Sequence, residues 1–296
     1  MTTTSAEDGS FSFENIPYGT WYVREIEQPD GFVLDDTIYP VTIDADGQIV
    51  EIKIVNKYVR GNIHLTKVDS EYPDNKLTGA TFEVYKDSNA NGKLDDGDEL
   101  LGTLTEKEKG EYSMNDLFYG RYFVKETKAP EGFVLDTGVY EVMIDTGGKT
   151  YEVENKAGVG FINDAMRGNL KIVKTSSDGK VKGFAFRITG ANGYDIILET
   201  NDKGEIFIDG LRIGDYTISE VSNSASSMYV LPADKKATVK LGSTTIVEMH
   251  NVLRDTPKTG DTTNLPLLYA LAGLSAVGIA VCGVIGFKKK KKEDRN

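Results

Sequence analysis

The sequence is poor in the residues that make disulfides, metal centres and acid–base sites. It contains one cysteine, Cys282, and two histidines, His64 and His250, in 296 residues. A single cysteine permits no intramolecular disulfide, and two histidines leave almost no material for a zinc centre or a His-based active site. A nucleophile elbow, a His-Glu-x-x-His motif and a phosphate-binding loop are also missing. We therefore predict that the protein is not a turnover enzyme, and that any covalent bond stabilising its domains uses other chemistry.

Positive charge and helical patterns are scarce as well. The 34 Lys and Arg against 46 Asp and Glu give a net charge of −12, which argues against nucleic acid as a partner. No convincing amphipathic helix precedes residue 265. Alternating apolar residues, Gly turns and β-branched or aromatic side chains instead predict short antiparallel strands.

The chain repeats itself, and the repeats predict its domains. One pattern begins with Gly, carries an aromatic residue two positions later and ends with Glu, in residues 19–25, 120–126 and 214–220. A second pattern, Arg-Gly-Asn followed by alternating apolar residues and Lys, opens residues 60–67 and 167–174. We therefore predict an all-β fold of tandem immunoglobulin-like β-sandwich modules, followed by a C-terminal transmembrane helix. The boundaries are 1–57 (module one), 61–165 (module two), 168–252 (module three) and 256–296 (a tail).

Module one holds only the second half of the repeat. No signal peptide precedes it, so we expect a fragment of a longer gene product. Without its opening strands the module should be poorly ordered or only partly paired, with an adhesive open sheet edge.

Each complete module places a glutamate and a lysine in phase with its core. Glu126 and Glu220 alternate with the apolar residues of their strands, as Lys67 and Lys174 do with theirs. Burial should favour the neutral form of each, giving a protonated acid and a nucleophilic amine.

These residues resemble the SpaA or Cna-B type of surface-protein and pilin domain, a prealbumin-like sandwich. In that family a first-strand Lys and a last-strand Asn form an intramolecular isopeptide bond, assisted by a Glu. The resemblance implies that Lys174 bonds Asn251 with Glu220 assisting, and that Lys67 reacts with Glu126 assisting.

The asparagine partner of Lys67 has two candidates. The interval of 31 residues from Glu25 to Asn56, and from Glu220 to Asn251, favours Asn155, which lies 29 residues after Glu126. The junction sequence 161–169 aligns with 54–62 and instead favours Asn163, which we prefer. In module one the lysine would lie upstream of Met1, so Glu25 and Asn56 should lack a partner.

Module two carries an insertion rich in oxygen ligands. Against a twelve-position EF-hand loop, its residues 87–98 supply positions 1, 3, 5, 7, 9 and 12 through Asp87, Asn89, Asn91, the Lys93 carbonyl, Asp95 and Asp98. The last position is Asp instead of Glu and flanking helices are lacking. The loop therefore predicts a weak calcium site, with a polar hairpin tip as the alternative.

The tail resembles the sorting signal of Gram-positive cell-wall proteins, in which a sortase cuts between Thr and Gly of Leu-Pro-x-Thr-Gly. Here the motif reads Thr256-Pro257-Lys258-Thr259-Gly260, with Thr in place of the usual Leu. The apolar run 265–287 is long enough to cross a membrane as a helix, and a lysine cluster at 288–292 follows it. The resemblance implies removal of the span and transfer of Thr259 to peptidoglycan or to another pilin subunit.

Together these features predict a structural surface protein, a pilin-like shaft or adhesin stalk on a Gram-positive cell wall. The alternative is an adhesin whose modules themselves bind host matrix or cell-surface glycans.

Overall fold

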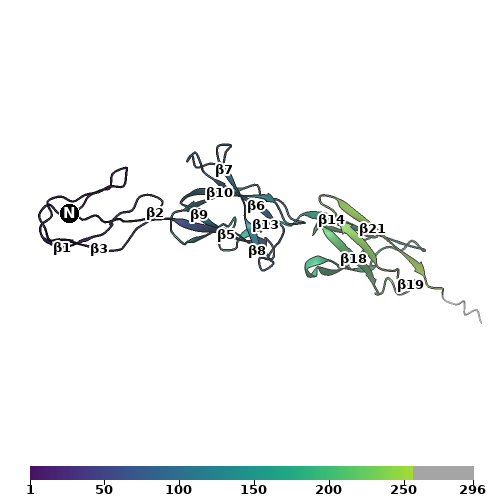
Figure 1. Ribbon diagram of the computed structural model, residues 1–296. Helices are drawn as coiled ribbons and strands as arrows, with labels where there is room; N and C mark the ends of the chain where they lie inside the picture. Colours follow the sequence, from purple (N-terminus) through teal and green to yellow (C-terminus); the bar gives the residue numbers. More distant parts are fainter. Residues whose placement is uncertain (256–296) are drawn as a thin grey trace, which may run out of the picture.

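The computed structural model describes residues 1–255, which form three bodies arranged head to tail in an elongated row (Figure 1). Strands supply nearly all of the regular structure, and the one helical element of this range is the 3₁₀ turn η1 (Ala191–Gly193). The predicted all-β architecture of tandem sandwiches is therefore confirmed. Within residues 1–255 no helix is long and apolar enough to cross a membrane, and the span predicted at 265–287 lies outside the described residues.

Module one is an open half-sandwich. Its strands are β1 (Gly19–Val23), β2 (Phe32–Val33), β3 (Tyr39–Ile43) and β4 (Lys57–Tyr58). They make two antiparallel pairs, β1 with β3 and β2 with β4. No residue from 1 to 58 is buried, because two separate pairs of strands do not enclose a core. The module is thus partly paired, as its half-repeat predicts.

Module two is a complete sandwich of two sheets. One sheet has the order β11-β10-β6-β7, and the other has β12-β5-β9-β8 with β13 also paired to β5. The strands are β5 (Arg60–Asp69), β6 (Thr81–Lys86), β7 (Glu99–Thr103), β8 (Thr105–Glu108), β9 (Glu111–Phe118), β10 (Gly120–Lys128), β11 (Val139–Ile144), β12 (Thr150–Glu152) and β13 (Phe161–Asn163). Its core contains Phe82, Tyr112, Tyr122 and Phe161.

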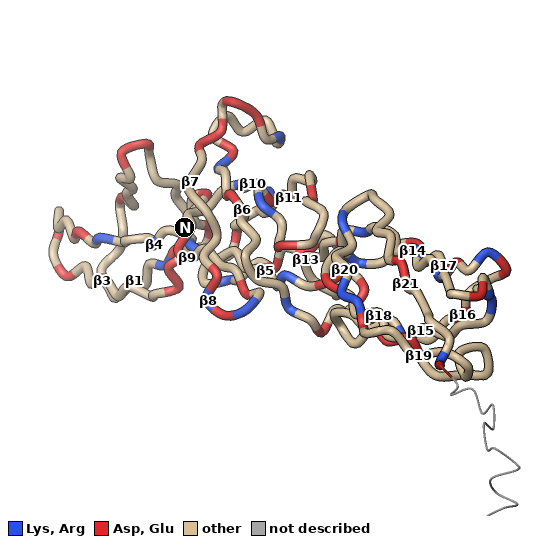
Figure 2. Tube along the Cα trace, turned by 90° about the vertical axis from the view of Figure 1, so that its right-hand side faces the viewer, with Lys and Arg blue, Asp and Glu red and all other residues tan. Residues whose placement is uncertain are grey.

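Module three repeats this plan. Its sheets have the orders β17-β14-β21-β19 and β16-β15-β18-β20. The strands are β14 (Arg167–Ser176), β15 (Ala185–Thr189), β16 (Asp195–Glu199), β17 (Glu205–Arg212), β18 (Gly214–Val221), β19 (Tyr229–Val230), β20 (Lys235–Val239) and β21 (Thr244–Leu253). A separate core forms around Phe184, Phe186, Tyr216 and Tyr229. Acidic residues are spread over all three bodies (Figure 2).

The opening strand of each complete module sends alternate side chains into its core. In β14 the buried positions are Gly168, Leu170, Ile172 and Lys174, and β5 shows the same alternation up to its lysine. The glycine of the repeated Arg-Gly-Asn is required by close packing, because a Cβ on Gly168 would lie 2.1 Å from the Lys240 carbonyl oxygen. The pattern that opens each repeat is therefore an interior strand of its sheet, with one face turned toward the core.

The last strand of each complete module runs parallel to the first. In module three β21 pairs with β14 without a break. In module two the partner of β5 is divided into β12 and β13. The difference in residue number between paired residues is 88 for Asn62 and Thr150, and it rises to 94 for Lys67 and Phe161. Six extra residues thus loop out between the two halves of the last strand.

Successive modules are joined without a free linker. At the first junction Val59 N–H donates to the Gly31 carbonyl and Tyr119 N–H donates to the Val59 carbonyl, at 2.7 and 3.1 Å. At the second junction Met166 and Ile213 make the equivalent bonds, to the carbonyls of Gly132 and Met166, at 2.8 and 3.0 Å. These repeated bonds hold each module on the end of the preceding one.

Candidate functional site

The lysine of module two lies inside the sandwich, at the inner face of β5. Lys67 has no exposed surface, and its Nζ donates a hydrogen bond of 2.9 Å to the Phe161 carbonyl on β13. Burial lowers the pKa of Lys67 to about 8, although the carboxylates of Glu126 and Asp136 oppose the shift. A larger fraction of this amine is therefore neutral at physiological pH than of an exposed lysine, and the neutral form can act as a nucleophile.

Glu126 and Asn163 meet beside this lysine. Glu126, on β10 in the opposite sheet, is fully buried, and Asn163 at the end of β13 is nearly so. The Asn163 Nδ2 donates to Glu126 Oε2 at 2.8 Å and to the Val134 carbonyl at 2.7 Å. Burial raises the pKa of the Glu126 carboxyl, against the hydrogen bonds from Asp136 N–H and Asn163 that favour its ionised form. The acid is therefore biased toward the protonated state.

Module three contains the same three groups. Lys174 on β14 and Glu220 on β18 are buried, and the Asn251 Nδ2 on β21 donates to Glu220 Oε1 at 2.6 Å. The Lys174 Nζ lies 4.1 Å from the centre of the Phe184 ring and donates to the Thr175 carbonyl. Burial lowers the pKa of Lys174 and raises the pKa of Glu220. The site thus occurs in both complete modules.

The strand register places the asparagine identically in the two sites. Lys67 is level with Phe161, and Asn163 follows two residues later on the parallel strand β13. Lys174 is level with Met249, and Asn251 again follows two residues later on β21. A separation of two keeps both side chains on the inner face of the sheet, so each amide lies diagonally ahead of its lysine.

Equivalent oxygen atoms lack a partner in both sites. Among the described residues, Glu126 Oε1 and Asn163 Oδ1 are buried without a hydrogen bond, as are Glu220 Oε2 and Asn251 Oδ1. An unpaired buried polar atom costs about 1 to 3 kcal/mol, and native proteins keep few of them. One carboxyl oxygen and the amide oxygen are therefore unpaired at matching positions in the two modules.

Asn155, the other candidate for Lys67, has a different role. Its Nδ2 donates to Asp136 Oδ2 and to the Ile162 carbonyl, both at 2.8 Å, while its Oδ1 accepts from Ile162 N–H at 2.6 Å. Asn155 lies in the segment that loops out between β12 and β13, and its hydrogen bonds hold β13 in place. The structure brings Asn163, and not Asn155, against Glu126.

Module one retains the acid and the amide. The Asn56 Nδ2 donates to Glu25 Oε2 at 2.6 Å and to the Val33 carbonyl at 3.2 Å, as Asn163 does to Glu126 and Val134. Glu25 and Asn56 thus contact each other, because their mutual contact needs only segments that module one contains. No lysine takes part in the hydrogen bonds of either residue within the described range.

Sequence reasoning missed an aspartate that supports the acid. Asp136 donates its backbone N–H to Glu126 Oε2 at 2.8 Å, and its carboxylate accepts from the Tyr140 hydroxyl. Asp35 makes the same backbone bond to Glu25. A signal was present, since Gly-Phe-Val-Leu-Asp occurs in both modules, at 31–35 and 132–136.

The predicted calcium loop is the hairpin tip between β6 and β7. Asp87, Asn89 and Asn91 accept bonds from backbone N–H groups of the loop, and Asp95 accepts from the Asn89 and Asn91 side chains at 3.0 and 2.5 Å. An Arg121 guanidinium nitrogen also lies 3.7 Å from Asp87 Oδ2. Within residues 1–255 no group of three or more His, Cys, Asp or Glu side chains gathers as a metal centre would.

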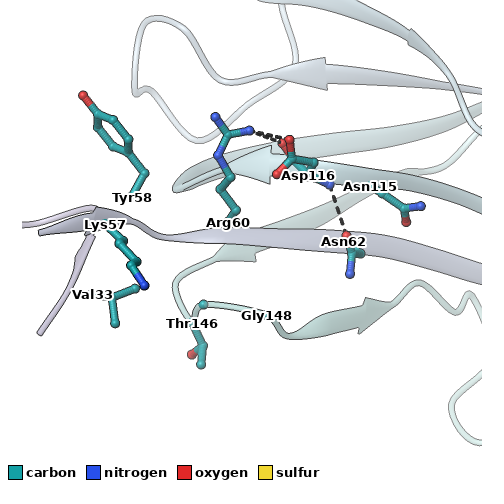
Figure 3. A pocket seen from close by; sticks show the side chains of 10 residues that line it. Val33, Lys57, Tyr58, Arg60, Asn62, Asn115, Asp116, Thr146 and Gly148 are labelled. Atoms are coloured by element: carbon teal, nitrogen blue, oxygen red, sulfur yellow. Dashed lines mark hydrogen bonds and ion pairs between the residues drawn. The ribbon is translucent and has the colours of Figure 1, made fainter. Parts of the chain in front are cut away.

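Two further features concern binding and anchoring. A cavity of about 660 Å³ opens at the first junction (Figure 3), and Arg60 in it is paired with Asp116 at 2.5 Å. It is lined by Val33, Lys57, Tyr58, Arg60, Asn62, Asn115, Asp116, Thr146, Gly147 and Gly148. The sorting motif at 256–260 lies outside the described residues.

Comparison with known proteins gives consistent matches. A family model described as SpaA, a prealbumin-like fold domain, matches residues 1–58, 61–157 and 168–252. The chain is 24% identical over 247 residues to Colossin-A of Dictyostelium discoideum, covering 74% of this chain and 2% of that protein. It is 29% identical over 194 residues to the trypsin-resistant surface T6 protein of Streptococcus pyogenes, covering 64% of this chain and 32% of that protein. The chain therefore spans less than a third of either relative.

Among solved structures, the Bacillus anthracis TIE protein superposes with a TM-score of 0.60. It is 24% identical to this chain, and the match covers 84% of this chain and 44% of that one. At this identity the likeness shows a shared fold.

Proposed function

This chain belongs to the SpaA family of prealbumin-like fold domains, and from this we propose that it is a structural protein of a Gram-positive cell surface whose complete modules are each closed by a Lys–Asn isopeptide bond. The observation that carries the proposal is the recurrence of one buried Lys, Glu and Asn set, with one register, in modules two and three. The streptococcal relative is described as a surface protein, which supports the location.

The reaction needs only the groups that each module contains. The neutral Lys67 amine adds to Cγ of Asn163, while the protonated Glu126 donates a hydrogen bond to the amide oxygen. A bond forms between Nζ and Cγ, the bond from Cγ to Nδ2 breaks, and a proton from Nζ passes through the carboxyl to the departing nitrogen. One ammonia leaves for each bond, and the carboxyl is regenerated. The chemistry is single-turnover, in keeping with a protein that is not an enzyme.

The bond would serve a shaft under tension or proteolytic attack. It joins the first strand to the last, so force applied at the two ends of a module passes through it instead of through the core. The description of the streptococcal relative as trypsin-resistant supports this role. With no disulfide available, the isopeptide bond is the covalent closure this composition allows.

Intact mass tests the proposal directly. Purified chain comprising residues 1–255 should be lighter than its sequence mass by two ammonia molecules, one for each complete module. Lys174→Ala should restore one ammonia, and Glu220→Ala should do the same while leaving Lys174 unbonded. A mass equal to the sequence value would refute bond formation.

We further propose that the protein is fixed to the wall by a sortase acting on Thr259. The support is the motif at 256–260 followed by the apolar run and lysine cluster. In a Gram-positive host Thr259→Ala should shift the protein from the wall fraction to the membrane fraction, with Thr262→Ala as the control that leaves sorting unchanged. Wall-released protein that still carries residues 265–287 would contradict this mechanism.

A ligand-binding adhesin is the second candidate, and the cavity at the first junction favours it. Its side chains mix apolar surface with the Arg60 and Asp116 pair (Figure 3), a lining suited to a polar ligand such as a glycan. Purified 1–255 would be tested on a glycan array and on immobilised collagen and fibrinogen. Binding that is lost in Arg60→Ala would favour the adhesin, and no binding would favour a purely structural shaft.

A further inference from the structure

The second junction contains a buried ion pair directly beside the lysine of module two. Asp69 lies two residues after Lys67 on β5, and both side chains are fully buried. Arg212, at the end of β17 in module three, holds the Asp69 carboxylate with two bonds, Nη1 to Oδ2 at 2.6 Å and Nη2 to Oδ1 at 2.8 Å. The remaining bonds to this carboxylate come from the backbone N–H groups of Glu71 and Tyr72. Module three thus supplies the countercharge of a carboxylate in module two.

Arg212 is held firmly in this position. It also contacts Glu71 at 2.8 Å, and its guanidinium lies 4.9 Å from the centre of the Tyr72 ring. Its side chain is 14% exposed. At the first junction the equivalent position is Phe118, which packs on Tyr58 at 5.6 Å between ring centres. Of the two described junctions, only the second therefore has this ion pair.

The charges facing Lys67 give this pair a chemical consequence. Acidic groups approach the amine from three segments: Glu126 on β10, Asp136 in the loop after it, and Asp69 on β5 itself. Each favours the ammonium form, which is not a nucleophile. Of these three acidic groups, Asp69 is paired with the Arg212 guanidinium, whereas Asp136 accepts a hydrogen bond from the Tyr140 hydroxyl. When Arg212 pairs with Asp69, it offsets one of these negative charges. It thereby disfavours the ammonium form of Lys67 and favours the neutral amine.

We propose that docking of module three onto module two promotes isopeptide formation in module two, with Arg212 as a positioning and charge-compensating residue acting through Asp69. The proposal rests on the isopeptide bond proposed above. It makes bond closure depend on assembly: module two closes rapidly only when the next module is folded in place. The acidic groups near Lys174 are Glu220 and Asp178, and the cation beside Asp178 is Lys180 at 3.5 Å, so all of these charges belong to module three and it closes independently.

The test follows bond formation in the full 296-residue chain made by cell-free synthesis. Samples are quenched over time and digested, and the peptides crosslinked between 67 and 163 and between 174 and 251 are quantified by mass spectrometry. In Arg212→Met, loss of the guanidinium should raise the pKa of Lys67 by about one unit. Less of the amine is then neutral at pH 7, so the module-two bond should form about tenfold more slowly. The module-three bond should keep its wild-type rate, and the module-two rate should recover at pH 9 as the amine loses its proton.

Two further variants separate charge from structure. Arg187→Met is the matched control, since Arg187 pairs with Asp195 on the surface of module three at 2.5 Å, and it should change neither rate. Adding Asp69→Asn to Arg212→Met removes the uncompensated carboxylate and should restore the module-two rate. Equal rates in Arg212→Met and wild type, or a slow double variant, would overturn the proposal. If wild type yields neither crosslinked peptide, the isopeptide function itself fails, and this inference with it.

Discussion

Replacing Lys174 by methionine should remove the covalent bond of module three while keeping the side-chain volume. Methionine is an unbranched apolar side chain of similar length that can fill the space beside the Phe184 ring, where the Lys174 Nζ lies, and it brings no amine into the core. The bond closes a loop that runs from position 174 to position 251, so it spans 77 residues. The chain-entropy relation for a crosslink of that length gives about 4.5 kcal/mol, lost in the variant. For a domain of this size that corresponds to a fall in melting temperature of roughly 20 to 30 °C.

The assay must report the stability of module three separately from that of the other modules. Hydrogen exchange measured by mass spectrometry on peptides from β14 and β18 does this. Lys171→Met is the control, because Lys171 lies on the same strand but faces Glu205 at the surface, at 2.7 Å. A half-exposed pair of this kind contributes about 0 to 1 kcal/mol. The reasoning is refuted if the two variants destabilise module three equally, or if exchange in module two changes as much as in module three.

The other predictions concern the second module. Asn163→Ala should abolish its ammonia loss, whereas Asn155→Ala should leave the ammonia loss in place and only increase exchange near residue 162; the reverse result in the intact mass would move the bond to Asn155. The rate of bond formation at Lys67 should rise with pH and reach half of its maximum near pH 8, because burial lowers the pKa of this amine to about 8 and only its neutral form attacks. A rate that is flat between pH 6 and 9 would show that deprotonation does not limit the step. Calcium should bind the hairpin tip with a Kd of roughly 10⁻⁴ to 10⁻³ M and raise the free energy of unfolding of the module by about 1 to 2 kcal/mol at tenfold excess over Kd. If calcium shifts the melting temperature equally in wild type and in the double variant Asp87→Ala, Asp98→Ala, the loop is a polar turn.

Local pattern was enough to predict much of the fold. Alternation of apolar and polar residues has the period of a strand wherever it occurs, so β5 and β14 could be located, and the phase of Lys67 and Lys174 within them predicted burial. The repeated Glu positions gave the facing strands in the same way. These features depend only on neighbours within a few residues, which is why the amino-acid order specifies them.

The choice between Asn155 and Asn163 required the tertiary structure. The spacing from the glutamate favoured Asn155, and the alignment of the junctions favoured Asn163. The two disagreed because six extra residues loop out between β12 and β13, which changes the spacing without changing how the strands pair on either side. Asn155 then uses all of its bonding groups on Ile162 and Asp136. Pairing between strands decided which amide reaches the acid.

What the sequence by itself determined is therefore the strand content, the module repeat and the identity of the buried acid and amine, since each follows from periodicity along the chain. Only the tertiary structure decided which groups meet across modules. Asp69 and Arg212 are 143 residues apart, and nothing in either local pattern links them. Their contact depends on how the modules stack: at the second junction backbone bonds join Ile213, next to the end of β17, to Met166, and Met166 to Gly132 of module two. The direction in which one module stacks on the next is a property of the folded surfaces.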